Sequence, residues 1–428
     1  MTRYSAGTNG LVYQQVVMPM PHFTPEQMDL LPLYSTCATE MGVGHRDYLA
    51  TQLWHSSVVG SYSASANVRS DKDCLEKLHG NISFSAKGLA SNQAAMTDLM
   101  QQSIEHTRFD ELPRLRELVA QIRSYRESSI VGNGHIMAMH AAASGLSTSA
   151  YLTQRWSGLS GLSLIKALDT SLNNEQELEK LASQLQEIHT KVLQQPRQHL
   201  LIAEQERLDV FETQIQSNFK THAENKSTVS NFIDYQPTLS SSNHCWTANT
   251  QVSFCARAYP TVPAGHEDSA ALTVLGGVLR NGFLHRAIRE QGGAYGGGAS
   301  QDNQSGAFRF YSYRDPRIEG TLKDFDESVN WLLETPPSAD KVEEAILGVI
   351  GTLDKPSSPA GEAIQAFHSE LNGRNKASAL AFRNRILNVT SGDLKRVAEK
   401  YLCQELAHTA IITNTDLATT SGLNTIAV

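Results

Sequence analysis

One stretch of the chain, residues 264–316, combines a helix pattern with two strand patterns and constrains the fold most. Apolar side chains recur at every fourth position in its first part: Leu275, Leu279, Phe283 and Ala287. This period predicts a helix with one buried face. Glu267 and Asp268 are expected in the first turn of that helix, where carboxylates oppose the positive end of the helix dipole. Gly292 and Gly293 are expected to end it.

The second part of this stretch predicts a β-hairpin. Residues 295–301 form a glycine-rich strand, residues 302–306 a polar turn, and residues 307–314 a second strand. Phe308 and Phe310 alternate with Arg309, Tyr311 and Tyr313, so aromatic and polar residues take opposite faces. A helix would therefore place Arg289 near its C-terminus, and Tyr295 would start the strand that follows.

Helices grouped with hairpins, without strict alternation of strand and helix, predict the α+β class. We expect two related domains, residues 1–219 and 244–428, each a mainly antiparallel sheet with long helices on one face. Residues 220–243 are polar and patternless, and are the expected linker. Residues 48–65 and 283–300 align without a gap, which suggests a duplication.

The aligned repeats differ at the two polar positions. Arg289 falls opposite Trp54, and Tyr295 falls opposite Gly60. A duplicated scaffold with polar donors in only one copy suggests that the second copy carries function. The structural alternatives are a helix-terminal cation for Arg289 and an ordinary surface residue of a strand for Tyr295.

Several local patterns predict helix ends. Capping boxes are expected at Thr24 with Gln27 and at Thr390 with Asp393. Pro356 and Pro359 interrupt the helical pattern of the second half, and residues after Thr415 are expected to fray.

Composition excludes some classes of function. The net charge of −8 argues against a nucleic-acid partner, which usually needs a basic face. No run of apolar residues is long enough to predict a membrane span. The five cysteines are odd in number and widely spaced, which favours free thiols in a reducing compartment. Because the first residues lack the apolar core of a signal peptide, we expect a cytoplasmic protein.

The fifteen histidines do not predict a metal site. None begins His-Glu-x-x-His or the inverted motif His-x-x-Glu-His. His135 and His140 share a predicted helix, but five residues place them roughly 140° apart around it. The glycine run 292–298 lacks the Lys-Ser/Thr of a phosphate-binding loop. Its glycines instead leave room for another backbone to approach, such as that of a peptide.

The segments IREQGGAYGGGA and FRFYSYRDP resemble the last domain of the presequence-protease branch of the insulinase/pitrilysin zinc metallopeptidases. In that family an Arg and a Tyr at this spacing reach the substrate at a zinc site that a different domain carries. Arg289 and Tyr295 match this pair and are the candidate catalytic residues, as contacts to the substrate carbonyl or oxyanion. Gly293, Gly296 and Gly297 are the candidate substrate-binding residues beside them.

The resemblance covers the second half of a four-domain architecture. It implies that this chain encloses unfolded peptide substrates, and that a zinc-bearing N-terminal half is its partner. The chain alone would then hold no zinc and cleave no peptide. The alternative is a non-catalytic scaffold or binding subunit of the same superfamily, although a scaffold would not need both Arg289 and Tyr295.

Overall fold

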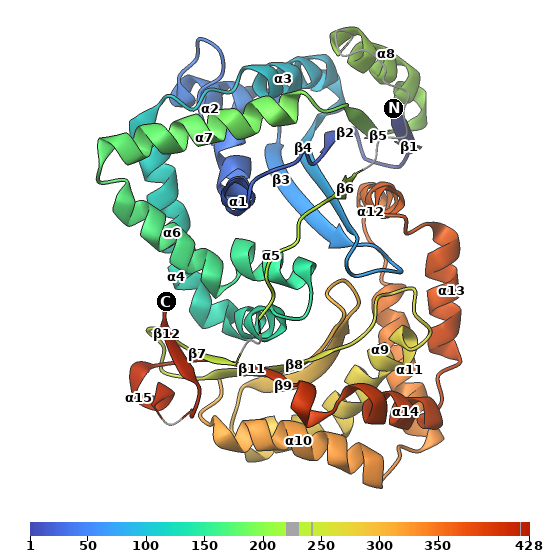
Figure 1. Ribbon diagram of the computed structural model, residues 1–428. Coiled ribbons are helices and arrows are strands. Elements are labelled where there is room, and N and C mark those ends of the chain that lie inside the picture. Colours follow the sequence, from blue (N-terminus) through green and yellow to red (C-terminus); the bar gives the residue numbers. More distant parts are fainter. Residues whose placement is uncertain (220–230, 241–242, 420) are drawn as a thin grey trace.

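The computed structural model describes residues 1–219, 231–240, 243–419 and 421–428, which form two sheets with many helices (Figure 1). The first sheet has the order β1-β5-β2-β4-β3, with β6 paired to β4. Its strands are β1 (Thr2–Ser5), β2 (Leu11–Pro19), β3 (Ser61–Ser70), β4 (Leu78–Leu89), β5 (Gln198–Ala203) and β6 (Phe232–Ile233). All pairs except β1-β5 are antiparallel.

The second sheet has the order β12-β7-β11-β8-β10-β9. Its strands are β7 (His244–Thr247), β8 (Phe254–Pro260), β9 (Gly296–Asp302), β10 (Ala307–Tyr313), β11 (His408–Thr413) and β12 (Asn424–Ala427). The pairs that β7 forms with β11 and β12 are parallel, and the others are antiparallel. The predicted α+β class with mainly antiparallel sheets is confirmed.

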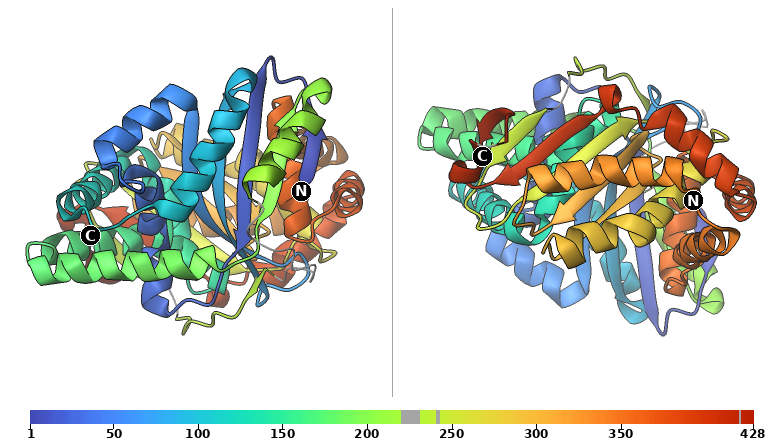
Figure 2. Two further views of the ribbon diagram at one scale, coloured as in Figure 1. Left: turned by 90° about the horizontal axis from the view of Figure 1, so that it is seen from above. Right: turned by 90° about the horizontal axis from the view of Figure 1, so that it is seen from below.

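Helices surround both sheets. Those of the first half are α1 (Pro25–Glu40), α2 (Tyr48–Val58), α3 (Gln93–His106), α4 (Leu112–Ala143), α5 (Thr148–Ser157), α6 (Leu159–Ser171), α7 (Glu175–Leu193) and α8 (Leu208–Asn218). Those of the second half are α9 (Ser269–Leu279), a π-helical segment (Arg280–Gln291), α10 (Glu319–Glu334), α11 (Ala339–Leu353), α12 (Pro359–Leu371), α13 (Lys376–Leu387), α14 (Ser391–Tyr401) and α15 (Thr415–Ala418). Seen from below, helices of the second half cover the outward face of its sheet (Figure 2).

The two sheets repeat one topology. The path β1-β5-β2-β4-β3 corresponds strand by strand to β7-β11-β8-β10-β9. The sequence alignment of residues 48–65 with 283–300 places Ser61 on Gly296, and these are the first residues of β3 and β9. The shared strand order supports the duplication that the alignment suggested.

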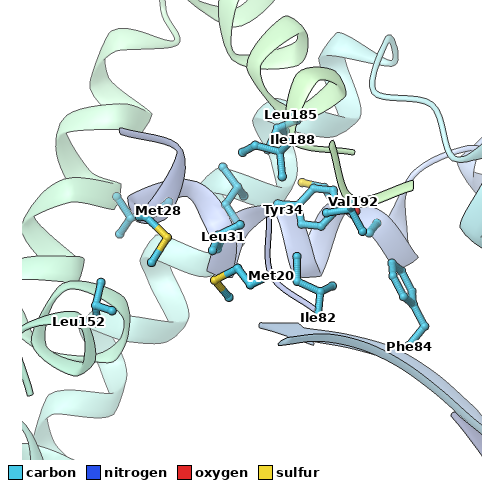
Figure 3. Close-up of a cluster of buried hydrophobic side chains, with 14 of the residues drawn as sticks. Met20, Met28, Leu31, Tyr34, Ile82, Phe84, Leu152, Leu185, Ile188 and Val192 are labelled. Atoms are coloured by element: carbon cyan, nitrogen blue, oxygen red, sulfur yellow. The ribbon is translucent and has the colours of Figure 1, made fainter. Parts of the chain in front are cut away.

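Alternation of apolar residues along the strands builds the core of the first half. Leu31 and Tyr34 of α1 pack between Ile82 of β4 and Ile188 of α7 (Figure 3). All four side chains are buried with no measurable exposure. Burial of such large side chains contributes about 1.5–3 kcal/mol each.

Each sheet also receives a helix from the other half of the chain. The C-terminal part of α4 packs on β8, β10 and β11 of the second sheet, and Gly134 lies so close that a Cβ would stand 2.5 Å from the Phe254 ring. In return, Ala363 and Phe367 of α12 pack on Val17 of β2 and Ile202 of β5. The two halves therefore share apolar surface as well as a linker.

The strands of the two sheets separate at the predicted linker, residues 220–243. Residues 220–230 and 241–242 of it lie outside the described residues. Its described part holds the short strand β6, which pairs with Leu78 and His79 of β4. The division into domains 1–219 and 244–428 stays a prediction.

Both capping boxes are confirmed. The hydroxyl of Thr24 accepts from the N–H of Gln27 at 3.3 Å, and that of Thr390 accepts from the N–H of Asp393 at 3.2 Å. Two other predictions are wrong. Pro359 starts α12 instead of breaking a helix, because proline suits the first helical position and the Ser358 hydroxyl caps the N–H of Gly361 at 3.1 Å. The residues after Thr415 do not fray as a whole, since β12 pairs with β7.

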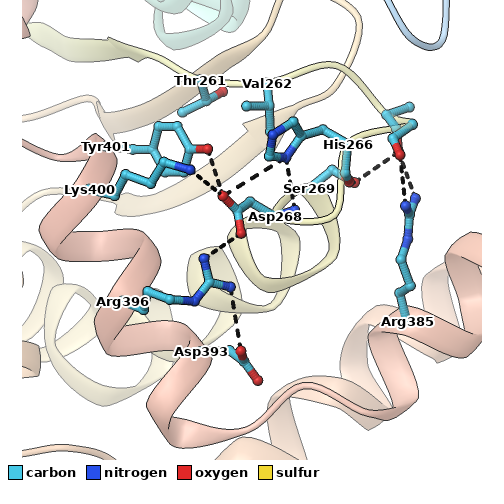
Figure 4. Close-up of polar contacts among 12 residues, drawn as sticks. Thr261, Val262, His266, Asp268, Ser269, Arg385, Asp393, Arg396, Lys400 and Tyr401 are labelled. Atoms are coloured by element: carbon cyan, nitrogen blue, oxygen red, sulfur yellow. Dashed lines mark hydrogen bonds and ion pairs between the residues drawn. The ribbon is translucent and has the colours of Figure 1, made fainter.

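The start of the helix α9 also differs from the prediction. The helix begins at Ser269, so Asp268 precedes the first turn. Its carboxylate is fully buried and accepts hydrogen bonds from Arg396 at 2.5 Å, Lys400 at 2.9 Å and Tyr401 at 2.7 Å (Figure 4). Burial alone would raise the pKa of Asp268, but these three donors lower it far below its usual range. Asp268 thus joins α9 to α14.

Candidate substrate-contact site at the edge of the second sheet

The π-helical segment Arg280–Gln291 brings Arg289 to the start of β9. Sequence periodicity predicted an ordinary helix here, because an apolar repeat at every fourth position does not distinguish the two forms. The segment ends at the glycine pair, as predicted. Gly293 has a φ of +80°, which favours glycine, and its N–H donates to the carbonyl of Arg289 at 3.2 Å. The N–H of Ala294 donates to the carbonyl of Ile288 at 3.1 Å.

Tyr295 lies next to Arg289. Its backbone N–H donates to the carbonyl of Tyr313 at 3.1 Å, and β9 begins one residue later. The Cζ atom of Arg289 stands 6.0 Å from the centroid of the Tyr295 ring. The structure therefore brings together the two residues that the sequence singled out.

Both side chains are available to a ligand. The Tyr295 residue is 66% exposed. Arg289 is also exposed and, within the described part of the chain, pairs with no carboxylate. Its neighbour Glu290 instead faces His285, with 3.3 Å between carboxylate oxygen and Nδ1. An unpaired guanidinium beside a free phenol offers donors for a carbonyl oxygen or a developing oxyanion.

Sequence reasoning missed the residues that support Tyr295. The Tyr313 ring meets Tyr295 edge-on at 5.5 Å and lies 4.6 Å from the ring of His135 on α4. Arg314 adopts a φ of 50° and places its Cζ atom 5.3 Å from the Tyr313 ring. Strand alternation had put Tyr313 and Tyr311 on one face, but no sequence pattern brings α4 of the first half to that face.

His135 has an unusual environment for a surface helix. Its Nδ1 atom is buried without a hydrogen-bond partner, and burial lowers the pKa of the imidazole. The ring also lies 5.7 Å from that of Tyr311. His135 and His140 share α4, as predicted, and His140 faces Arg309 and Asp302 instead.

The three candidate glycines occupy different environments. Gly293 forms the turn, and the space beside Gly296 is open to at least 4 Å. A Cβ at Gly297 would stand 2.9 Å from the side chain of Ile288, so packing against the π-helical segment requires glycine there. β9 is the edge strand of its sheet, and among the described residues its outer edge pairs with no strand.

The first sheet lacks this arrangement at the equivalent positions. Trp54, opposite Arg289 in the alignment, is half-buried and stacks with Arg46, whose Cζ atom lies 4.2 Å from the ring. Gly60, opposite Tyr295, has no side chain. The donor pair is therefore specific to the second repeat.

The described residues offer no group of three or more His, Cys, Asp or Glu side chains that could hold a metal. They do not fit zinc, and no chemical step is assigned to a metal on this chain. None of the helices in the described ranges combines the length and apolar character that crossing a membrane requires.

Comparison with known proteins gives the class. The family of domains associated with subfamily C of the M16 peptidases matches residues 1–168, and the PreP C-terminal domain matches residues 243–414. A protease from Helicobacter pylori superposes with a TM-score of 0.64 at 14% identity, covering 95% of both chains. A peptidase M16 inactive domain from Pseudomonas fluorescens gives 0.65 at 14% identity, covering 96% of this chain and 95% of that one. Fold and family models together define the chain as part of an M16 peptidase.

The particular branch follows from the sequence relatives. Mitochondrial presequence protease of Yarrowia lipolytica is 27% identical over 399 residues, which cover 93% of this chain and 40% of that protein. The same protein of Danio rerio is 29% identical over 416 residues, covering 92% and 40%. The chain spans about 40% of the length of these curated relatives. It belongs to the presequence-protease branch and corresponds to its C-terminal part.

Proposed function

We propose that this chain is the substrate-enclosing C-terminal half of a zinc metalloendopeptidase that degrades short unfolded peptides. The observation that carries the proposal is the pair of Arg289 and Tyr295 at the open edge of the second sheet. The guanidinium is unpaired among the described residues, and Tyr295 is 66% exposed. The presequence proteases that the chain matches support the substrate class.

The edge strand and the donor pair divide the work on a peptide. β9 presents an unpaired strand edge, along which an extended peptide backbone can add as a further strand. The open space beside Gly296 leaves room for that backbone. Arg289 and Tyr295 then donate hydrogen bonds to the carbonyl oxygen under attack and stabilise the negative charge that develops on it.

The partner in this proposal is an N-terminal half that carries zinc and the general base. When bound there, zinc supplies Lewis-acid activation of water and carbonyl. Unfolded peptides are the second partner, and no nucleic acid is expected at a net charge of −8. All five cysteines are free thiols, which supports the proposal of a reducing, cytoplasmic compartment.

The substitution Tyr295→Phe tests the role of the pair in the complete enzyme. It removes one hydroxyl from an exposed ring, so folding should be unchanged. Loss of a single oxyanion donor costs about 3–4 kcal/mol, or 10²–10³ in rate. We expect kcat/KM to fall substantially, with a lower kcat if the donor acts in the transition state.

A matched control is Tyr125→Phe, which removes the hydroxyl of a 74% exposed tyrosine on α4. It should leave peptide cleavage unchanged. Equal kcat/KM for wild type and Tyr295→Phe, with intact folding, would remove the pair from the site. That outcome would favour the alternative of a non-catalytic scaffold or binding subunit of the same superfamily.

A further inference from the structure

The first sheet has a polar face that the peptidase site does not use. Residues on β3 and β4 stand directly opposite one another across the strands as Ser63 with Ser85, Ser65 with Ser83, and Asn67 with Asn81. Their neighbours Ile82, Phe84 and Ala86 point the other way, into the core around α1. Short polar side chains on one face leave space above the sheet.

Helix α12 covers this face only in part. Its apolar residues Ala363 and Phe367 pack on Val17 and Ile202, over β2 and β5. Above β3 and β4 a cavity of about 510 Å³ remains between the sheet and α12. Ser83 and Asn81, which line it, are buried although they are polar. A volume of roughly 300–1,000 Å³ is typical of small-ligand sites.

Three basic side chains line the cavity: Arg69 from β3, His368 from α12, and Arg374 just after α12. The Nε and Nη2 atoms of Arg374 are buried and have no hydrogen-bond partner. Neither arginine forms an ion pair with a carboxylate in the described part of the chain. The Oδ1 atom of Asn372, also in the lining, is a buried acceptor without a partner.

The carboxylates near Arg374 are engaged elsewhere. Asp71 holds His79, with 3.0 Å between oxygen and Nε2, and Asp302 holds Arg309 at 3.1 Å. Burial first, and then the positive charge of Arg69, lower the pKa of the Arg374 guanidinium. The same two causes lower the pKa of His368. The cavity therefore concentrates uncompensated positive charge, which costs stability unless an anion is bound.

We propose that the cavity between β3, β4 and α12 is a binding site for an oxyanion, the carboxylate or phosphate group of a small organic molecule or of a peptide end. A guanidinium matches the two oxygens of such a group with paired hydrogen bonds. The asparagine and serine side chains of the sheet supply further neutral donors. The site is separate from Arg289 and Tyr295 and does not depend on their role.

Isothermal titration calorimetry on the chain tests the site with three probes. These are inorganic phosphate and two short peptides that differ only in a free or an amidated C-terminus. We expect phosphate or the free-acid peptide to bind, more weakly at higher salt. Phosphate binding alone identifies a phosphate site, and discrimination between the two peptides identifies a carboxylate site.

Two variants and one control connect binding to the cavity. Arg374→Gln and Arg69→Gln should each weaken binding tenfold or more. Arg374→Gln should not lower the melting temperature, because it removes a buried charge without a partner. Since Arg69 is exposed, its variant should fold in any case. The control Arg383→Gln makes the same charge change on α13, at a surface pair with Asp354, and should leave binding unchanged. Failure of all three probes to bind the wild type, or equal binding by both variants, would overturn the proposal.

Discussion

Replacement of Asp268 by asparagine should destabilise the chain, because this buried carboxylate joins α9 to α14. Asparagine keeps the shape but loses the charge, and its NH2 group would face donors instead of receiving them. The carboxylate is fully buried, while the side chains of Arg396 and Lys400 are 50% and 52% exposed. Breaking a buried ion pair costs about 3–5 kcal/mol, and exposed partners reduce that figure. We expect the free energy of unfolding to fall by about 2–3 kcal/mol at neutral pH.

The pH dependence gives this prediction its sign. The three donors depress the pKa of Asp268 in the folded state below the unfolded value of about 3.9. The carboxylate therefore stabilises the fold above pH of about 4, and this contribution is lost as the pH falls through the folded-state pKa. The difference between wild type and Asp268→Asn should shrink below pH of about 4.

Urea denaturation followed by circular dichroism measures both effects. The matched control is Asp110→Asn, which removes an exposed carboxylate paired with Arg108 at 3.2 Å and should change stability by less than about 1 kcal/mol. If Asp268→Asn behaves like this control at pH 7, or if its deficit is the same at pH 3, the carboxylate does not hold the two helices together.

Two further predictions concern the chain as a whole. Because the described residues hold no group of metal ligands, plasma mass spectrometry should find no stoichiometric zinc in the purified chain; one tightly held zinc with peptidase activity would contradict this. Limited proteolysis should cut first within residues 220–243, the predicted linker, whereas early cuts within residues 272–289 would contradict the domain division.

Much of the fold could be predicted from local sequence chemistry. The capping box at Thr24, the alternation around Phe308 and Phe310, and the glycine stop at Gly293 each depend on a few neighbouring residues. The structure places them as expected. The two wrong predictions arose where one residue type has two meanings. Pro359 starts a helix as readily as it breaks one, and β12 depends on a partner strand that is distant in sequence.

The candidate site shows the same division. The sequence alone indicated Arg289 and Tyr295, because they lie six residues apart across a predicted helix end. It could not indicate His135, which reaches Tyr313 only because α4 crosses onto the second sheet. Nor could it indicate the cavity under α12. The alternating polar face of β3 and β4 was visible, but the position of Arg374 over it depends on tertiary packing.

Reconstitution of peptide cleavage tests the central claim most directly. The chain would be mixed with the zinc-bearing N-terminal half that completes it, and cleavage of a short unfolded peptide would be followed by the release of fluorescence. Neither half alone should cleave the peptide, and the mixture should, with Arg289→Ala and Tyr295→Phe each strongly impaired. Cleavage by the zinc-bearing half that this chain does not increase would contradict the account.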